Sequence, residues 1–194
     1  NQLMAPIERA SVLVVGPGLG QAAWGRSLLS AVVPARHAQV WDADALNLLA
    51  QAPLPLAAGS IITPHPGEAA RLLGISTEAV QADRPGAARK LARKYAAVCV
   101  LKGAGTLVAD PAGQLALCSR GHPAMAGAGL GDVLSGVLGA LLAQGMPAWS
   151  AACLGVWLHA CAGERLGVQG RGLAASDLVP AIRQVLEEHS ACQV

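Results

Sequence analysis

The hydrophobic positions of this chain fall into two kinds of segment that alternate along the sequence. Short runs rich in β-branched residues are typical of buried strands, whereas apolar residues spaced three or four positions apart are typical of helices. This alternation predicts an α/β fold with a mostly parallel sheet covered by helices on both faces. The expected strands are Ser11–Val15, Ala38–Trp41, Ser60–Thr63 and Val98–Leu101, followed by a hairpin of Thr106–Ala109 and Gln114–Cys118.

Helices are expected between these strands and after them, and proline or glycine ends most of them. Within the long segment before the fourth strand, Pro85 predicts either a kink or a second helix start. The segment Trp149–Leu166 is apolar nearly all round, which predicts a buried helix. The expected helices are Trp24–Val33, Ala45–Gln51, Glu68–Leu73, Thr77–Tyr95, Val133–Leu142, Trp149–Leu166 and Ser176–His189.

An unusual loop directly follows each of the four parallel strands. These loops are GPG from Gly16, DAD from Asp42, TPHPGE from Thr63 and KGAG from Lys102. The carboxyl ends of parallel strands meet at one edge of a sheet, and ligands of such folds bind there. We therefore expect the four loops to converge on one ligand site, joined by the glycine-rich stretch from Met125 to Gly136.

That stretch, MAGAGLGDVLSG, is the most specific local signal in the chain. A simple N-cap would explain Asp132, but it would not explain Gly127, Gly129 and Gly131. Glycines allow several backbone N–H groups to point the same way, and the positive end of the following helix dipole makes the site favourable for an anion. Because a carboxylate repels a bound anion, Asp132 is expected to act on the other reactant, as a base toward a hydroxyl that attacks a phosphoryl group.

The other loops each allow a structural and a functional interpretation. Gly16–Gly20 has the spacing G-x-G-x-G rather than the dinucleotide pattern, so it indicates either a tight turn or close approach of the backbone to a ligand. His65 lies between two prolines at a strand end, which favours a ligand contact over a structural role. Since no other histidine or cysteine lies at ligand spacing, the protein is expected to have no metal site of its own. Lys102–Thr106 is either a hairpin with an exposed lysine or a loop around a nucleotide's phosphate or ribose, and it lacks the Walker A pattern.

Composition narrows the class of protein. The mean hydropathy is +0.44, but the longest apolar runs, Val133–Ala143 and Ala151–Gly163, are too short and interrupted to span a membrane. A net charge of +2, no phenylalanine and one tyrosine disfavour nucleic-acid binding. The five cysteines show no C-x-x-C spacing and are expected to be free thiols in a reducing cytoplasm. No basic and then apolar leader opens the sequence, so no secretory signal is expected.

Taken in order, GPGLG, DADAL, TPHPGE, LKGAGT and GLGDVLSG resemble a known set of motifs. A G-x-G-D anion hole whose aspartate is the catalytic base is found in the ribokinase-like superfamily. The complete set is similar, more narrowly, to the NAD(P)H-hydrate dehydratase family, and the resemblance covers essentially the whole chain. It implies a ribokinase-like three-layer α/β/α fold with a mostly parallel central sheet.

The resemblance also implies an activity. The family removes water from hydrated NADH or NADPH, using ADP or ATP with Mg²⁺: the hydrate's hydroxyl is phosphorylated and the phosphate is then eliminated. By resemblance, Asp132 is the catalytic base on the hydrate hydroxyl. The resemblance places Gly129 and Gly131 in the anion hole. It assigns the binding of the hydrated dinucleotide to Gly18 and His65 together with Asp132. The residues that it assigns to the adenine nucleotide are Lys102, Gly103, Ala104, Gly105 and Thr106.

The chain departs from the family pattern in two places. It has His122-Pro123-Ala124 where the family usually has Asn-Pro-Gly, and Ala128-Gly129 where the family has Gly-Gly. Family domains also carry a strand and helices before GPGLG. Residues 1–194 are therefore expected to form a single domain truncated at its N-terminal side, within a longer protein that carries a fused N-terminal epimerase domain and assembles as a homo-oligomer.

Two other functions remain open from the sequence. One is a small-molecule kinase of the same superfamily that acts on a vitamin-precursor alcohol. The other is a non-catalytic nucleotide-binding module. TPHPGE and DADAL favour the dehydratase over the kinase, although related kinases contain similar stretches.

Overall fold

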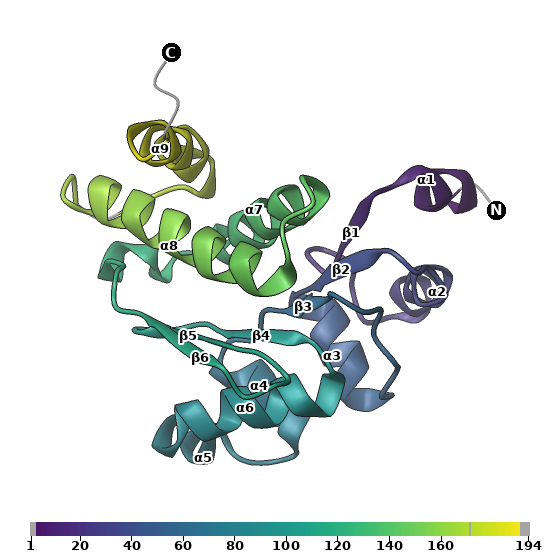
Figure 1. Ribbon diagram of the computed structural model, residues 1–194. Helices are drawn as coiled ribbons and strands as arrows, with labels where there is room; N and C mark the ends of the chain where they lie inside the picture. Colours follow the sequence, from purple (N-terminus) through teal and green to yellow (C-terminus); the bar gives the residue numbers. More distant parts are fainter. Residues whose placement is uncertain (1–2, 171, 191–194) are drawn as a thin grey trace.

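The central sheet has its strands in the order in which they occur along the chain (Figure 1). The first four are parallel, and the last two form an antiparallel hairpin at one edge. The structure is a computed structural model that describes residues 3–170 and 172–190. The strands are β1 (Val12–Val15), β2 (Ala38–Trp41), β3 (Ile61–Ile62), β4 (Val98–Leu101), β5 (Thr106–Ala109) and β6 (Leu115–Cys118).

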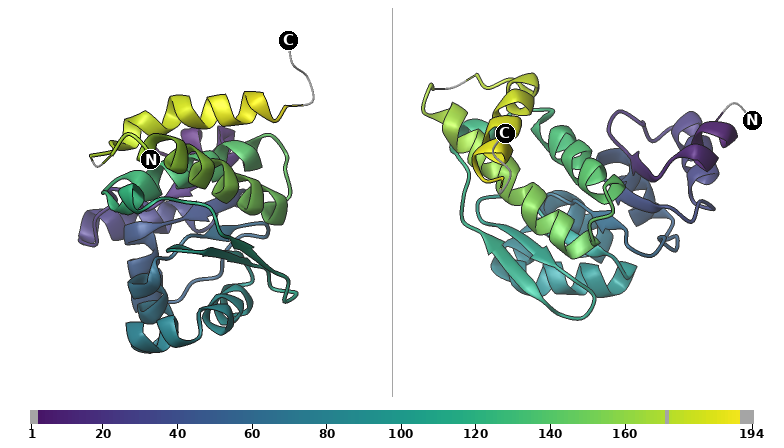
Figure 2. Two further views of the ribbon diagram at one scale, coloured as in Figure 1. Left: turned by 90° about the vertical axis from the view of Figure 1, so that its left-hand side faces the viewer. Right: turned by 45° about the horizontal axis from the view of Figure 1, so that its top comes forward.

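Helices cover both faces of the sheet, so the expected three-layer α/β/α arrangement is confirmed (Figures 1 and 2). On one face lie α2 (Ala23–Val32), α3 (Ala43–Gln51), α4 (Pro66–Leu73), α5 (Thr77–Ala82) and α6 (Arg84–Tyr95). On the other face lie α7 (Leu130–Ala143) and α8 (Ala148–Gly167), with α9 (Ala175–Glu188) packed on the outer side of both. A short helix α1 (Met4–Arg9) precedes β1, and a 3₁₀ turn η1 (Pro123–Ala126) precedes α7.

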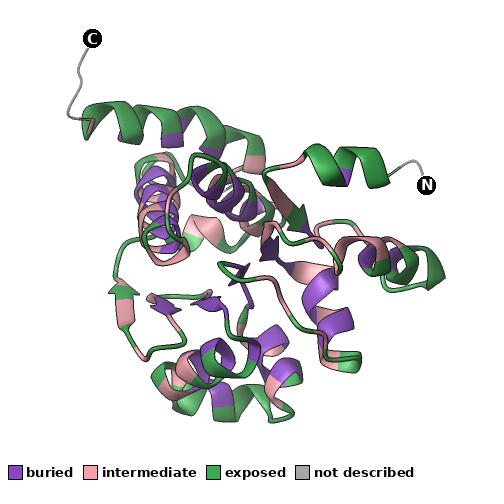
Figure 3. Ribbon diagram, turned by 45° about the vertical axis from the view of Figure 1, so that its right-hand side comes forward, coloured by how far each residue is buried: buried purple, intermediate pink, exposed green. Residues whose placement is uncertain are grey.

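The hydrophobic core lies in the two spaces between the sheet and these layers (Figure 3). Successive residues of a strand point to opposite faces, and β2 shows this directly. Val40 packs with α7 and α8, whereas the next residue, Trp41, packs with α3 and α6; both are fully buried. The nearly all-apolar helix α8 packs between the sheet and α9, which explains why its sequence lacks a polar face.

The structure decides one open alternative and differs from the sequence expectations in two places. The segment from Thr77 is two helices, so the second helix start that Pro85 allowed is the one observed: Asp83 ends the first helix and caps the second by accepting a hydrogen bond from the N–H of Gly86. Helix α1 had no clear periodic signal. The strand expected to be buried near Ser11 is β1 at the edge of the sheet, where the side chain of Val14 is 44% exposed.

Two expectations from composition concern the whole chain. Among the described residues, no helix is long and apolar enough to cross a bilayer. The thiols of Cys99, Cys118, Cys153 and Cys161 are free, as expected, while Cys192 lies outside the described residues. Burial raises the pKa of the Cys99 thiol, which keeps it protonated and unreactive in the core.

One glycine in the first loop cannot carry a side chain. Gly16 has a φ of 129°, and a Cβ there would collide with the backbone carbonyl of Asp42. Gly18, two residues on, has a φ of 66° and open space around the same position. Glycine is therefore required at Gly16 because a side chain would collide with the backbone, whereas at Gly18 it is favoured only by the left-handed backbone conformation.

We expect Gly16→Ala to reduce the free energy of unfolding by about 3 kcal/mol or more, because backbone strain and a collision act together. Gly18→Ala is the matched control and is expected to cost about 1–2 kcal/mol, from the left-handed conformation alone. Urea denaturation of the two variants measures both values. Equal losses would contradict the assignment of a steric role to Gly16.

Candidate functional site

The buried carboxylate of Asp42 joins three segments of the fold at the carboxyl edge of the sheet. Asp42 follows β2 and is 1% exposed. Its Oδ1 lies 2.7 Å from the Nζ of Lys102, which follows β4, and its Oδ2 accepts a 2.7 Å hydrogen bond from Ser135 Oγ on α7. Oδ1 also accepts from the N–H of Ala43 and so caps α3. This charge-assisted cluster fixes where the Lys102 amine lies.

The Lys102 amine is held against the first turn of α7. A Cβ built on Gly131 would lie 3.4 Å from Lys102 Nζ. Gly129 is the N-cap of α7, in the left-handed conformation with a φ of 80°. The unpaired N–H groups and positive dipole end of the helix therefore act at the same place as a fixed cation, an arrangement that favours a bound anion.

Arg84, the first residue of α6, holds the turn between β4 and β5 through hydrogen bonds. Its Nη2 donates to the carbonyls of Leu101 at 3.4 Å and Gly105 at 3.0 Å, one on each side of the turn. Gly103 lies directly over the guanidinium, since a Cβ there would be 2.6 Å from Nη1. Burial lowers the pKa of Arg84, but the group stays charged at neutral pH. The KGAGT turn is thus a fixed loop rather than a flexible linker.

His65 caps the start of α4 together with Glu68. The Nδ1 of His65 accepts from the N–H groups of Gly67 at 3.0 Å and Glu68 at 3.4 Å, and Glu68 Oε2 accepts from the N–H of His65 at 2.8 Å. This reciprocal pair is a capping box, which requires an unprotonated Nδ1. Burial, with the nearby charges of Lys102 and Arg71, lowers the pKa of His65, and burial raises the pKa of Glu68.

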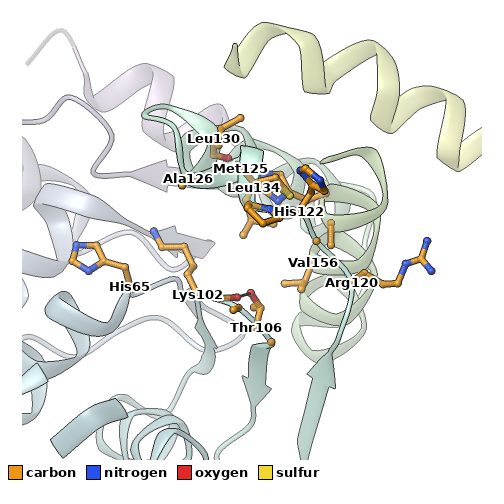
Figure 4. A pocket seen from close by; sticks show the side chains of 18 of the residues that line it. His65, Lys102, Thr106, Arg120, His122, Met125, Ala126, Leu130, Leu134 and Val156 are labelled. Carbon is orange, nitrogen blue, oxygen red and sulfur yellow. Dashed lines mark hydrogen bonds between the residues drawn. The ribbon is translucent and has the colours of Figure 1, made fainter. Parts of the chain in front are cut away.

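A cavity of about 770 Å³ opens between the KGAGT turn, the first turn of α7, and α8 (Figure 4). This volume is in the range of small-molecule sites. Figure 4 shows Lys102 and Thr106 across the cavity from His122 and Val156. Among the described residues that line it there are histidine, lysine and arginine side chains but no aspartate or glutamate. This charge balance suits an anionic ligand.

The wall opposite Lys102 is the segment from Ser119 to Ala126, which we call the 119–126 wall. Two helical glycines of α8 receive its side chains: a Cβ at Gly163 would collide with Met125, and a Cβ at Gly167 would collide with His122. Glu164, between these glycines, accepts from the N–H of Gly121 at 2.7 Å and lies 2.6 Å from the Arg120 guanidinium. The wall is therefore docked on α8 by both packing and charge.

The structure brings together most of the residues expected at the site. Gly131 lines the cavity, whereas its neighbour Asp132 is exposed in the first turn of α7 and does not line it. Neither Gly129, the N-cap, nor Gly18, exposed in the loop after β1, is a lining residue. The expected residues that do line the cavity are His65, Lys102, Gly103, Ala104, Gly105, Thr106 and Gly131.

Sequence analysis missed several residues that hold this site in place. Asp42 was noted only as part of a loop, and Ser135 is, after Asp132, the one further polar residue of an otherwise apolar helix. Arg84 is one of several cations on a polar helix face. His159 of α8 lines the cavity, and burial lowers its pKa. For His159, the available signal was its place as the interruption of the apolar run Ala151–Gly163.

The fold and the site together define a class of protein. A parallel sheet with its loops gathered around an anion site at the start of a glycine-preceded helix is the arrangement of the ribokinase-like superfamily. A solved ribokinase-like superfamily protein from Enterococcus faecalis matches 100% of this chain and 68% of its own, with a TM-score of 0.86 and 25% identity.

The chain belongs to the NAD(P)H-hydrate dehydratase family, whose model matches residues 1–184. It is 51% identical over 109 residues to the bifunctional NAD(P)H-hydrate repair enzyme Nnr of Escherichia coli, a match that covers 56% of this chain and 21% of that protein. The chain therefore spans about a fifth of that relative. It is also similar to a Bacillus subtilis ADP/ATP-dependent NAD(P)H-hydrate dehydratase co-crystallized with ATP/Mg²⁺, with 29% identity and a TM-score of 0.82 over 95% of this chain and 69% of that one.

The His65 cap makes stability depend on pH. Because the folded pKa lies below the unfolded value of about 6.5, the unfolded chain binds more protons as the pH falls through that value. The contribution of His65 is therefore fully present above pH of about 6.5 and is lost on acidification. The raised pKa of Glu68 has the opposite effect on the pH dependence of folding stability. Its contribution to the free energy of unfolding is present below a pH of about 4.5 and is lost as the pH rises above that value.

We expect an NMR titration of the His65 ring to give a pKa below 6.5 in the folded protein. His65→Asn keeps an N-cap acceptor that does not titrate, so the rise in unfolding free energy from pH 5 to 7 is expected to be smaller in this variant. Chemical denaturation across that range measures the slope. A ring pKa at or above 6.5, or an unchanged slope, would show that the cap does not depend on the neutral ring.

Proposed function

We propose that residues 1–194 form a single dehydratase domain that restores NADH or NADPH from its hydrated form, with ADP or ATP as phosphoryl donor. The hydrate's hydroxyl is phosphorylated and phosphate is then eliminated. The observation that carries the proposal is the meeting of the Lys102 amine, the KGAGT turn and the start of α7 at one wall of a cavity whose described lining residues include no acid. Membership of the NAD(P)H-hydrate dehydratase family supports the choice of substrate.

The proposed nucleotide site is the cavity itself. Lys102, Gly103, Ala104, Gly105 and Thr106 form one side of it, and Arg84 holds their turn rigid. The transferred phosphoryl group is proposed to lie at the first turn of α7, next to Gly129 and Gly131. There the helix N–H groups and the lysine cation stabilise the charge that develops during transfer.

Asp132 is proposed as the base on the hydrate's hydroxyl. Successive residues of an α-helix project about 100° apart, so Gly131 and Asp132 face different sides of the first turn. Gly131 lines the cavity and Asp132 does not, which separates a carboxylate from the phosphates it would repel. This supports a substrate that approaches from the Asp132 side, toward the loop of Gly18, with His65 at the boundary of the two sites.

Whether Mg²⁺ fits the proposed nucleotide site depends on the oxygen ligands available there. Among the described residues, no three His, Cys, Asp or Glu side chains are grouped to hold a metal ion. Mg²⁺ at nucleotide sites takes most of its ligands from phosphates and water, with one or two carboxylates. Asp42 and Glu68, the acids beside Lys102, are buried, have hydrogen-bond partners already and do not line the cavity, so the nucleotide phosphates and water would supply the ligands. The ion would supply positive charge between the nucleotide phosphates.

The wider context is part of the proposal. The bifunctional E. coli relative supports an epimerase domain fused on the N-terminal side of the dehydratase domain in the whole protein. We also propose a homo-oligomer in the cytoplasm, with no nucleic-acid partner. Exposed apolar side chains on the edge strands β1 and β6, Val14 and Leu117, support self-association.

The full-length protein is expected to convert hydrated NADH to NADH when ADP or ATP and Mg²⁺ are present. The recovered near-ultraviolet absorbance of the reduced nicotinamide measures the reaction. Recovery without nucleotide, or nucleotide binding with no recovery, would reject the dehydratase. Phosphoryl transfer to a vitamin-precursor alcohol without recovery would instead support the kinase.

Asp132→Asn is expected to reduce turnover about 100-fold or more while nucleotide affinity stays within about twofold of wild type, because the base is lost with little change in volume. Asp177→Asn, in the first turn of α9, is the matched control for losing a carboxylate at a helix start, and it is expected to retain turnover. Steady-state rates and calorimetric ADP affinities measure the two effects. Normal turnover in Asp132→Asn would remove its assigned role.

A further inference from the structure

Helix α7 begins without a capping side chain of its own. The N-cap residues of α3, α4, α5 and α6 accept hydrogen bonds from their helix N–H groups through their side chains, whereas those of α2, α8 and α9 make no such bond, like that of α7. The N-cap of α7 is Gly129, which has no side chain, and Gly127 and Gly131 flank it. Glycines lose the most conformational entropy on ordering, so this helix start needs support from elsewhere.

That support comes from a histidine of the neighbouring helix. The Nε2 of His159, on α8, lies 2.8 Å from the carbonyl oxygen of Leu130, the first residue of α7. A carbonyl oxygen only accepts hydrogen bonds, so this Nε2 must carry the proton. The side chain of Leu130 is itself 2% exposed in a core cluster with α8 and α9. The first residue of α7 is thus held by its side chain and by its backbone.

The rest of the His159 ring belongs to the cavity. His159 is one of its lining residues, and burial lowers the pKa of the ring; the bond to Leu130 acts in the opposite direction, and the charge of Lys102 adds a smaller lowering. Nε2 is therefore committed to α7 while the same ring forms part of the ligand wall. A histidine placed this way couples the position of the helix start to the shape of the cavity.

We propose that His159 is a positioning residue that fixes the first turn of α7, and with it the N–H groups of the anion site, through its Nε2–H bond to the Leu130 carbonyl. The link to ligand binding rests on the proposed function, whereas the geometric claim does not. The bond is a tether to the first carbonyl of α7 and not an N-terminal cap: it holds the glycine-rich segment in place, leaves the helix N–H groups free and puts no side chain in the path of the phosphate.

Two variants separate the hydrogen bond from packing. His159→Gln keeps an N–H donor at a similar reach, and His159→Leu fills similar space without a donor. In the absence of ligand, hydrogen exchange of the backbone amides from Val133 to Val137 is expected to be about five- to tenfold faster in the leucine variant and near wild type in the glutamine variant. Equal rates in the two variants, either both fast or both slow, would overturn the proposal.

Ligand affinity is measured on the same proteins with ADP by calorimetry. His159→Leu is expected to weaken ADP binding about five- to tenfold, and His159→Gln to restore it to within about twofold. Unchanged ADP affinity in the leucine variant would overturn the role at the anion site. If wild-type protein binds neither ADP nor ATP while the exchange pattern holds, the proposed function fails and the helix-positioning role stands.

A third test uses the wild-type protein, so it does not depend on whether a variant folds. The ¹⁵N chemical shifts of the His159 ring distinguish a protonated from an unprotonated nitrogen. The proposal requires a proton on Nε2 and none on Nδ1 at neutral pH. A ring protonated on Nδ1 alone cannot donate to Leu130 and would overturn the proposal.

Discussion

The site depends on one buried carboxylate that has three partners. Removing a charge from water is costly. The Asp42 carboxylate is stable in the interior only because a cation pairs with it and a hydroxyl and a backbone N–H donate hydrogen bonds to it. Its partners come from a strand end, from the start of α3 and from α7. Loss of one member of such a buried pair typically costs about 3–5 kcal/mol. The alignment of β2, β4 and α7 at the site is therefore enforced by electrostatics as well as by packing.

Much of the fold could be predicted because its elements are encoded locally. The four parallel strands are short β-branched runs, and each ends at a loop whose composition differs from its surroundings. Those loops do meet at one edge of the sheet, as a parallel arrangement requires. The errors fall where distant residues decide the outcome. Nothing near Val14 in the sequence indicates that its strand lies at an edge of the sheet, whereas the second helix start that Pro85 allowed is encoded locally.

The site could be predicted only in part, for the same reason. Lys102 and Gly131 stood out because glycine-rich loops after strands are visible in the sequence. Their supports did not, because Asp42 and Ser135 are 93 positions apart and Arg84 reaches the KGAGT turn from another helix. His65 shows both sides of this: its place between two prolines favoured a ligand contact, which stays a prediction, and the structure shows that it lines the cavity while its Nδ1 caps α4. Local sequence patterns therefore identify residues that line the cavity better than the residues that hold those lining residues in position.

The docking of the 119–126 wall on α8 has a consequence for how the cavity changes during evolution. His122 and Met125 are seated over Gly167 and Gly163, so the width of the cavity is set by the absence of two side chains on a helix behind it. A single methyl group at either glycine would force the His122 or Met125 side chain to shift, although no residue that lines the cavity had been substituted. Selectivity for the size of a ligand can therefore be tuned from positions that a survey of contact residues would overlook.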